Sequence, residues 1–536
     1  MTYQISEISL PLDAAGEALA ERAAKRLQVS GQAVAQCKLV RRAVDARRKQ
    51  DVHFTCTAQV TLRPGTQVRR SVLQRDAKIR EVTPYQYQLP QSNPLAVRPV
   101  VVGLGPAGLL AALTLAQAGQ RPIVFERGAP VEARIRDVEH FWKTGRLDTS
   151  SNVQFGEGGA GAFSDGKLTT GTKDPRVRHV LEEFVQAGAP ACILWEAKPH
   201  IGTDRLPGMV AALRRRIEAL GGEVHFHTRL EAVDVRAGAL RAIQVQGGQG
   251  ESWKLPCTHL VLAVGHSARD TFAALLEQGF LLEQKPFAVG VRIEHLQAAV
   301  DRAQYGPAAG HPALGAADYK LAAHLPDGRG VYTFCMCPGG TVVPAASEEG
   351  RVVTNGMSNF ARDGENANAA VLVGLAPADF GSRHPLAGIH LQRRLEEAAF
   401  AAGGGAFAAP VQRLGDFLDK RASTGVGTVK PSYCRGTRPC DLHGCLPRFL
   451  TQALEDGIRQ MGHRLRGFDA PDALLTAVES RSSSPVRILR GQDCTAAGCA
   501  GVYPCGEGAG YAGGIMSAAV DGIRCAEAIL RSSCRQ

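Results

Sequence analysis

The 536 residues are enough for two to four domains of ordinary size. An apolar fraction of 44% with 21% charged residues is typical of a soluble globular protein, and no apolar run is long enough to span a bilayer. The first ten residues lack the basic-then-apolar order of a signal peptide, which favours a cytoplasmic protein. The 14 cysteines follow neither the spacing of a disulfide scaffold nor that of a zinc site, so we expect reduced core thiols and no metal.

Basic residues concentrate near the N-terminus. Residues 1–95 hold 15 Lys and Arg against 8 Asp and Glu, so most of the net charge of +11 lies there. The patterns predict strands over residues 5–10, 34–44 and 51–62 and a helix over residues 14–27 capped by Asp13. The third strand alternates apolar with polar side chains, which indicates one wet face. We therefore predict a basic N-terminal α/β domain over residues 1–95, closed by a proline-containing linker at residues 82–97.

Three cations lie in the turn between the second and third predicted strands. They are Arg47, Arg48 and Lys49. Such a cluster is a candidate contact for RNA or another polyanion, and a solvated charged face is the alternative.

The sequence GLGPAG at residues 103–108 stands between a valine-rich strand and a segment of good helix formers. In a dinucleotide-binding βαβ unit, Gly103 allows the tight turn, Gly105 brings the backbone close to a pyrophosphate, and Gly108 lets the helix lie on the strand. A second strand at residues 122–125 ends in Glu126, the expected acceptor for a ribose hydroxyl. These parts occur in the required order, which predicts a nucleotide site; a βαβ unit that binds nothing is the alternative.

Two further glycine-rich stretches are predicted to complete that site. The first, residues 152–168, has five glycines and follows the nucleotide unit, which favours a loop that wraps a ligand with its backbone. The second, GEGAGYAGG at residues 506–514, precedes a long helix and contains a formal GxGxxG. No strand with a terminal acid follows it, so we interpret it as a loop that closes over the far end of the first nucleotide. We accordingly expect no second dinucleotide fold.

The remaining pattern divides the chain into further parts. Residues 96–285 are predicted to form the first part of a nucleotide-binding domain, with Ser267 and Asp270 as a capping box. From about residue 286 to 494 strand-like runs mix with loops and a helix, which indicates an inserted α+β domain; residues 495–536 return to the first domain. The predicted fold class is α/β: a Rossmann-like fold with an inserted α+β domain and a small N-terminal α/β domain.

Several motifs resemble a known family. They are FGEGGAGAFSDGKL (155–168), GHSARDTF (265–272), PFAVGVRIEH (286–295), FCMCPGG (334–340), NGMSNFARDGENAN (355–368) and GEGAGYAGGIMSAAVDG (506–522), with VRRAVDARRK in the N-terminal domain. Together they are similar to the bacterial and plastid family of uncharacterised FAD-dependent dehydrogenases, within the glutathione-reductase-like superfamily. The resemblance implies FAD as the cofactor and leaves the substrate undefined. In that superfamily the C-terminal loop usually presents an aspartate to the flavin ribityl chain; Glu507 is the matching residue here.

The motifs give a set of expected cofactor contacts. These are Gly103, Gly105, Pro106, Ala107, Gly108, Glu126, Arg127, Arg134, Gly158, Gly159, Ala160, Gly161, Lys167, Gly265, Gly506, Glu507, Gly513, Gly514 and Ile515. The helix that begins near Ile515 is expected to point its N-terminus at the flavin, where negative charge develops on reduction.

Three residues are candidates for chemistry on a substrate. His266 follows the central strand and suits a proton donor, and a structural hydrogen-bonding histidine is the alternative. Cys335 and Cys337, one residue apart, are expected to point the same way on a strand; they are either a redox pair beside the flavin or core thiols. For Arg292 and Arg362, the choice is between binding an acidic substrate and forming surface salt bridges.

The sequence thus predicts an FAD-dependent oxidoreductase that transfers hydride through flavin N5, with an unknown small-molecule substrate or a protein electron donor and no membrane partner. A second hypothesis is a flavin-containing, RNA-associated protein in which FAD is structural or sensory.

Overall fold

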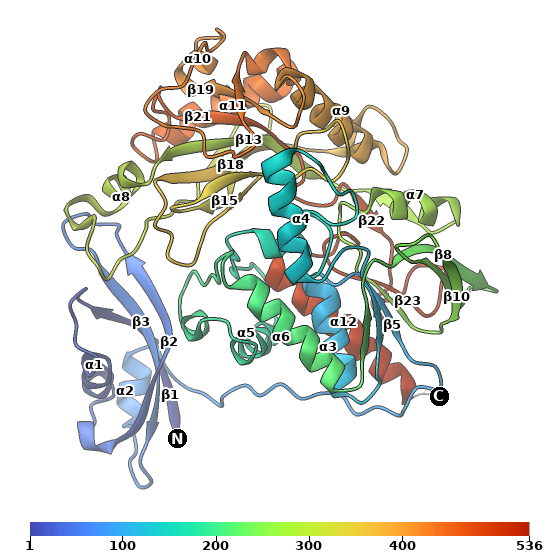
Figure 1. Ribbon diagram of the computed structural model, residues 1–536. Coiled ribbons are helices and arrows are strands. Elements are labelled where there is room, and N and C mark those ends of the chain that lie inside the picture. Colours follow the sequence, from blue (N-terminus) through green and yellow to red (C-terminus); the bar gives the residue numbers. More distant parts are fainter. Residues whose placement is uncertain (535–536) are drawn as a thin grey trace.

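The computed structural model describes residues 1–534, and a parallel sheet lies at its centre (Figure 1). This sheet has the order β23-β11-β5-β6-β7, and every neighbouring pair is parallel. Its strands are β5 (Val100–Val102), β6 (Ile123–Phe125), β7 (Glu223–His225), β11 (Leu260–Leu262) and β23 (Val502–Pro504). Strand β23 comes from the C-terminal part of the chain. The sheet is therefore complete only when residues 500–534 have packed against the first part of the domain.

Alternate residues of these short strands face two different cores. Val101 and Val261 pack against a layer of helices, whereas Val100 and Val102 pack against an antiparallel sheet and one helix. The helices of the first layer are α3 (Pro106–Gln117), α5 (Arg176–Gln186), α6 (Leu206–Ala219) and α12 (Ile515–Ser533). The opposite face carries β8 (Arg229–Arg236), β9 (Ala239–Gln246), β10 (Ser252–Pro256) and α7 (Arg269–Glu277). Because both faces of this parallel sheet are covered, its strands β5, β6 and β11 consist of consecutive apolar residues.

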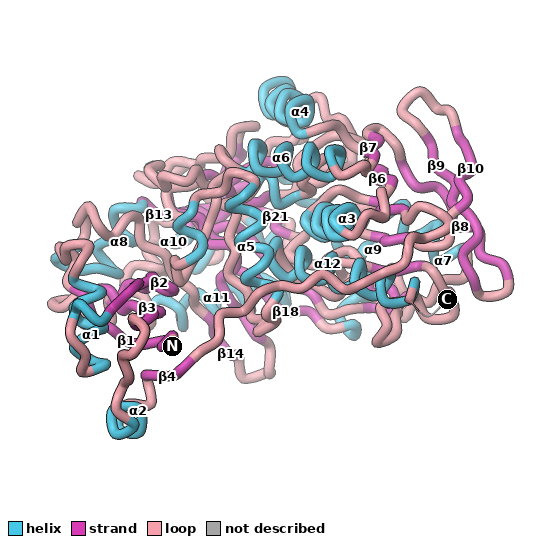
Figure 2. The backbone as a smooth tube through the Cα atoms, turned by 90° about the horizontal axis from the view of Figure 1, so that it is seen from below, coloured by secondary structure: helices cyan, strands magenta, loops and turns pink. Residues whose placement is uncertain are grey.

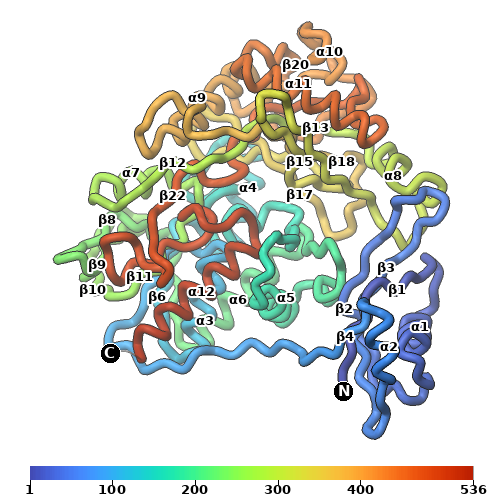
Figure 3. The backbone as a smooth tube through the Cα atoms, turned by 180° about the vertical axis from the view of Figure 1, so that it is seen from behind, coloured from blue at the N-terminus to red at the C-terminus, as the bar shows by residue number. Residues whose placement is uncertain are grey.

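Helices α3 and α12 lie side by side beneath the sheet (Figure 3). A Cβ at Gly522 of α12 would stand 2.1 Å from the carbonyl oxygen of Ala107 in α3, so only glycine permits this approach. The contact joins the first and last segments of the nucleotide-binding domain.

The inserted domain lies above this body and is built on a seven-stranded sheet of order β14-β15-β18-β13-β21-β19-β20 (Figure 1). Its strands are β13 (Phe287–Leu296), β14 (Ala322–His324), β15 (Gly330–Cys337), β18 (Asn366–Leu375), β19 (Ala409–Arg413), β20 (Thr437–Pro439) and β21 (Leu474–Glu479). The helices are α8 (Gln297–Tyr305), α9 (Ala387–Ala402), α10 (Leu414–Leu418) and α11 (Arg448–Gly462). Two small ribbons pair β16 (Thr341–Pro344) with β17 (Thr354–Met357), and β12 (Leu282–Gln284) with β22 (Val486–Ile488).

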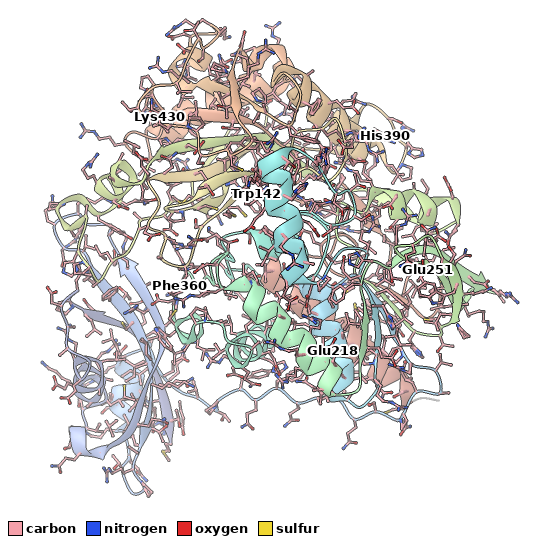
Figure 4. The ribbon with its side chains drawn as sticks, viewed as in Figure 1. Trp142, Glu218, Glu251, Phe360, His390 and Lys430 are labelled. Atoms are coloured by element: carbon pink, nitrogen blue, oxygen red, sulfur yellow. The ribbon has the colours of Figure 1, made fainter. Side chains whose placement is uncertain are left out.

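Two aromatic side chains hold the inserted domain against the nucleotide-binding domain (Figure 4). Trp142, on α4 (Val131–Thr144), donates from Nε1 to the carbonyl of Pro344 at 3.0 Å. Phe360 stacks on His200 with ring centroids 5.1 Å apart, and the guanidinium carbon of Arg205 lies 3.7 Å from its ring centroid.

The N-terminal domain has the order β2-β3-β1-β4 and the succession β-α-β-β-α-β, which is the ferredoxin-like topology. It comprises β1 (Thr2–Leu10), α1 (Ala18–Leu27), β2 (Val34–Asp45), β3 (His53–Leu62), α2 (Arg70–Arg75) and β4 (Ile79–Glu81). The alternation predicted for β3 is confirmed, since Phe54, Cys56, Ala58, Val60 and Leu62 are buried while their neighbours are not. Helix α1 begins at Ala18, later than predicted, and Asp13 does not cap it.

Residues 82–99 form no helix or strand and run along the base of the nucleotide-binding domain (Figure 2). This linker is anchored by Tyr87, whose ring stacks on His179 at 4.0 Å and whose hydroxyl donates to Glu527 of α12 at 3.2 Å. The N-terminal domain also touches the rest of the chain directly, because Arg42 pairs with Glu196 and Lys49 donates to the carbonyl of Gln304.

The predicted fold class is confirmed: one Rossmann-like domain in two chain segments, an insertion and a small N-terminal domain. Within residues 1–534 no second parallel sheet of the dinucleotide type occurs. No helix in that same range has the length and apolar character needed to cross a membrane.

Candidate cofactor and active site

One cavity lies where the nucleotide-binding domain meets the inserted domain. It encloses about 1510 Å³ of empty space, counted out to its opening into solvent. The nucleotide-binding domain contributes the carboxyl ends of β5, β6 and β11, where ligands of such sheets bind. The inserted domain contributes Phe334, Cys335, Cys337, Asn355, Gly356 and Glu479.

Most of the predicted cofactor residues line this cavity. They are Gly103, Gly105, Pro106, Ala107, Glu126, Arg127, Gly159, Ala160, Gly161, Lys167, Gly265, Glu507, Gly513, Gly514 and Ile515. The candidates for chemistry, His266, Cys335 and Cys337, line it as well. Gly108, Arg134, Gly158 and Gly506 do not.

The fingerprint glycines lie where the strand β5 gives way to α3. Gly103 has a φ of +94°, and a Cβ there would lie 2.3 Å from the carbonyl oxygen of Ala263. A Cβ on Gly108 would lie 1.8 Å from the carbonyl oxygen of Gly103, so Gly108 permits the helix-to-strand contact without touching the cavity. Gly105 stands at the start of α3, whose first turn presents free N–H groups and the positive end of the helix dipole to the cavity.

Glu126 is the acid at the end of β6, and only 5% of its surface is exposed. Its carboxylate accepts three backbone N–H groups, from Leu104 at 2.8 Å, Gly128 at 2.9 Å and Gly156 at 3.0 Å. It therefore joins the fingerprint loop to the glycine-rich loop at residues 152–168. Two carboxylate oxygens offer about four acceptor positions, so one stays free for a ribose hydroxyl in the cavity.

Replacing Glu126 with alanine is expected to weaken cofactor binding by about 1.5–3 kcal/mol, because a hydrogen bond to a charged group is lost. The three buried N–H groups also lose their acceptor, so the folded state should lose stability. Fluorescence titration of the apoprotein with FAD measures the first effect and urea unfolding the second. Unchanged FAD affinity in a folded Glu126→Ala protein would contradict this role.

Arg134 lies outside the cavity, contrary to the prediction. It was expected to contact the cofactor, but it is 0% exposed and lies behind the glycine-rich loop. Its guanidinium donates to the carbonyls of Asn152 at 2.9 Å, Val153 at 3.0 Å and Glu157 at 2.6 Å. Burial lowers the pKa of Arg134 to about 10, which leaves the side chain charged near neutral pH. Arg134 therefore shapes the loop, and a helix position alone did not show that its side chain turns away from the cavity.

Gly158 and Gly506 also support the site from behind. A Cβ on Gly158 would approach Val210 of α6 at 3.2 Å. The N–H of Gly506 donates to Asp521 of α12 at 2.8 Å, and Arg490 binds the same carboxylate at 2.6 Å and 2.9 Å. Asp521 thus fixes the start of the C-terminal glycine loop.

Asp521 also belongs to a compact group with Cys505 and Cys525, whose potential metal-ligating atoms lie within 4.8 Å of one another. Asp521 and Cys525 lie one turn apart on α12, and Cys505, directly after β23, is brought to them by the fold. The Asp521 carboxylate is already engaged by Arg490 and Gly506.

His266 and Glu507 meet on the cavity wall. The Nδ1 atom of His266 lies 3.2 Å from Oε1 of Glu507. The predicted capping box at Ser267 and Asp270 is wrong: Ser267 donates to Gln154 at 3.0 Å, and Asp270 pairs with Arg127 at 3.0 Å.

The two cysteines of FCMCPGG do not follow regular strand alternation. The pairing of β15 with β18 is irregular between Phe334 and Cys337, and Cys335 has a φ of +41°. The strand is therefore not regular at this point, as the prediction assumed, and both cysteines line the same cavity. Burial raises the pKa of the Cys335 thiol to about 12, so it stays protonated near neutral pH.

Arg292 holds the irregular backbone at Cys335 in place through a hydrogen bond to its carbonyl. Its side chain is 0% exposed, which excludes a surface salt bridge. Its guanidinium binds Glu479 through Nε and Nη2, the latter at 3.1 Å. It also donates to the carbonyl of Cys335 at 3.0 Å, to Asn368 at 2.8 Å and to Asn355 at 3.3 Å. Three of these partners, Glu479, Cys335 and Asn355, line the cavity.

Lys167 and Arg362 share one carboxylate. Asp165 accepts from Lys167 at 2.6 Å and from Arg362 at 2.6 Å, so the group carries one excess positive charge. Lys167 and Asp165 line the cavity. The arrangement brings the end of the glycine-rich loop against the ARDG segment of the inserted domain.

Sequence reasoning missed a buried charge cluster beneath the cavity. Arg481 lines the cavity, and both Arg481 and Arg269 bind Glu396, which is 0% exposed. Glu348 pairs with Arg269 as well. Buried arginines in paired positions carry no local sequence signal, because their partners lie about a hundred residues away in the sequence.

A curated relative matches the whole chain. The chain is 46% identical over 531 residues to an uncharacterised protein of Clostridium beijerinckii, covering 99% of each. The two proteins belong to one family. A family model described as "FAD-dependent protein, C-terminal domain-like" matches residues 286–482, and a domain of unknown function matches residues 2–61.

Solved flavoproteins are weakly similar in structure. The flavin-dependent brominase Bmp2 is 12% identical with a TM-score of 0.37, covering 82% of this chain and 80% of its own. A flavoprotein/dehydrogenase from Cytophaga hutchinsonii is 12% identical with a TM-score of 0.36, covering 81% and 79%. The FrdA subunit of E. coli quinol fumarate reductase is 12% identical with a TM-score of 0.33, covering 81% and 70%.

FAD is the cofactor that the matched domain model names, and the cavity fits it. The two helix N-termini of α3 and α12 suit a pyrophosphate and an electron-rich ring, and Glu126 suits the adenosine ribose. The buried Nε2 of His266 lacks a partner within the described residues, as expected for a wall that a ligand completes. The narrower placement in the glutathione-reductase-like superfamily stays a prediction.

Proposed function

We propose that the protein is an FAD-dependent oxidoreductase whose substrate binds between the cofactor and the inserted domain, beside residues 334–337. The observation that carries the proposal is the shared cavity, which both the dinucleotide fingerprint and the seven-stranded sheet line. Bound FAD supplies hydride transfer at N5. A site formed between two domains also excludes water from the reacting atoms.

The chain's own residues orient and enclose the ligands. Glu126 and the first turn of α3 hold the adenosine end, and the first turn of α12 faces the opposite part of the cavity. The backbone around Cys335 and Gly356 forms the wall toward the inserted domain, fixed by Arg292. Lys167 and Arg362 together with Asp165 carry one net positive charge, which favours a substrate with an anionic group.

Anaerobic reduction of the purified protein with NADH and with NADPH, followed by reoxidation with a panel of metabolites, tests the proposal. We expect full bleaching of the flavin absorbance and selective reoxidation by one class of compound. Substituting Asn355 with alanine should slow the substrate step and leave the FAD content unchanged. A flavin that no donor reduces and no metabolite reoxidises would contradict an oxidoreductase.

The RNA-associated alternative receives little support from the N-terminal domain. Sheets of this topology that bind RNA stack bases on aromatic side chains of the open face. Here the polar faces of β1 and β3 carry residues such as Gln4, Thr55, Thr57 and Gln59, with Tyr3 and Phe54 in the core. In the basic turn, Arg47 pairs with Asp45 and Lys49 binds the carbonyl of Gln304.

Removing residues 1–82 is expected to leave FAD binding intact, because none of these residues lines the cavity. The shortened chain should begin at Thr83, so that Tyr87 keeps its contacts with His179 and Glu527. The absorption spectrum of the soluble, folded protein measures the FAD content. Loss of FAD from such a protein would show that the N-terminal domain contributes to the site.

Replacing Cys335 and Cys337 together with serine is expected to cost about 1–3 kcal/mol of stability, because two partly or fully buried thiols become hydroxyls. The rate of flavin reduction should stay close to that of the parent, since the Cys335 thiol is protonated. Stopped-flow reduction and thiol titration of the oxidised and reduced protein check this. A thiol count that falls when the parent flavin is reoxidised would instead establish a redox pair.

A further inference from the structure

The contact between His266 and Glu507 depends on a glycine. A Cβ at Gly508 would lie 2.4 Å from the carbonyl oxygen of Gly265, so the two loops touch through their backbones only because residue 508 is glycine. Gly265 and His266 follow β11, and Glu507 precedes α12, about 240 residues later. The pairing of β11 with β23 brings the two segments side by side, and the backbone contact at Gly508 then brings the two side chains together.

The partner of Nδ1 determines the state of the imidazole ring. The Nδ1 atom of His266 faces Oε1 of Glu507 at 3.2 Å, and because a carboxylate only accepts hydrogen bonds, this neighbour favours the tautomer with the hydrogen on Nδ1. In the neutral ring Nε2 is then a free lone pair. It is buried in a residue that is 8% exposed, has no hydrogen-bond partner among the described residues, and belongs to the cavity wall.

The other charged groups near His266 and Glu507 are Arg481, Lys285 and Asp270, and none of them replaces Glu507 as the partner of the imidazole. Arg481, beside Ser267, is held by Glu396 at 3.0 Å and by Ser267 at 3.1 Å. Lys285, between β12 and β13, interacts with Glu507, and burial lowers its pKa. Asp270, at the start of α7, pairs with Arg127. Glu507 is therefore the carboxylate that directly contacts the imidazole.

We propose that His266, positioned by Glu507, takes up a proton at Nε2 when the bound cofactor is reduced; this rests on the proposed function. The reductant supplies two electrons and the proton that the cofactor itself takes up, a further proton from solvent bonds to Nε2 of His266, and the hydrogen on Nδ1 stays in place facing Glu507. On reoxidation the same proton leaves. The negative charge that reduction adds to the cavity stabilises the imidazolium, and the carboxylate of Glu507 stabilises it from the other side.

The midpoint potential of the bound FAD, measured against pH between about 6 and 8, tests this proposal without a substrate. Each proton taken up per two electrons makes the reduction constant fall tenfold per pH unit, which is about 30 mV. The parent should show one proton more than His266→Gln over part of this range. Glu507→Asp should keep the steeper dependence, whereas Glu507→Gln should shift it to lower pH or abolish it.

His259 provides a matched control, because it is also 8% exposed but lies before β11, away from the cavity. His259→Gln should retain the parent pH dependence, and the FAD dissociation constant of each variant separates proton uptake from cofactor retention. An equal slope in the parent and in a yellow His266→Gln protein would overturn the proposal and leave the oxidoreductase function standing. A protein that binds no FAD would overturn both.

Discussion

Replacing Arg292 with alanine is expected to lower the free energy of unfolding by about 3–5 kcal/mol, because Glu479 then remains as a buried, unpaired charge. Arg292 is 0% exposed, and Asn355, Asn368 and the carbonyl of Cys335 lose a donor as well. The irregular backbone at Cys335 should therefore relax, and the wall of the cavity with it. Urea unfolding of the FAD-loaded protein measures the loss.

A double variant separates the effect of leaving Glu479 as an unpaired buried charge from the effect of losing the packing of the Arg292 side chain. Arg292→Met combined with Glu479→Leu removes both charges, so it should be less destabilised than the two single variants predict by addition. Arg47→Ala is the surface control, since Arg47 is exposed and should produce no measurable change. Additive effects in the double variant would mean that the ion pair does not determine the stability of this region.

Replacing Gly108 with alanine is expected to destabilise the fold by about 3 kcal/mol and to weaken FAD binding more than tenfold. The new Cβ would stand 1.8 Å from the carbonyl oxygen of Gly103, and a backbone atom cannot move away as a flexible side chain can. Relief requires α3 to shift away from β5, which also moves the N–H groups that face the pyrophosphate. FAD titration and thermal unfolding measure the two effects.

Gly208 is the matched control, because it lies inside α6 with nothing within 4 Å of its ideal Cβ. Gly208→Ala should leave FAD binding unchanged and stabilise the helix slightly, since alanine has the higher helix propensity. If Gly108→Ala behaved like Gly208→Ala, the close helix-to-strand contact would not be needed for binding.

Local rules were sufficient for the nucleotide half of the site. The order of strand, GLGPAG, helix, strand and Glu126 places each of these parts by sequence-local geometry, and the structure has them at the cavity or directly behind it. Glu126 was predicted as a ribose acceptor, but the hydrogen bond from Gly156 could not be, because it depends on how the loop at residue 156 folds back.

The inserted domain was harder to predict, because its site residues depend on long-range contacts. Strand alternation failed at Cys335, where the irregular pairing with β18 breaks the period of two.

In the nucleotide-binding domain, Arg134 looked like a cofactor ligand from its place in the sequence, yet the carbonyls of residues 152–157 use its donors. His266 and Glu507 were each singled out, but not as a pair, since a contact between residues 265 and 508 is invisible in the sequence pattern.

The FAD content of the purified full-length chain tests the central claim most directly. Heat release followed by quantification of the nucleotide should give about one FAD per chain, and apoprotein should regain the flavin spectrum when FAD is added, with Glu126→Ala weaker than the parent. A folded, colourless protein that takes up no FAD on reconstitution would contradict the assignment of this cavity.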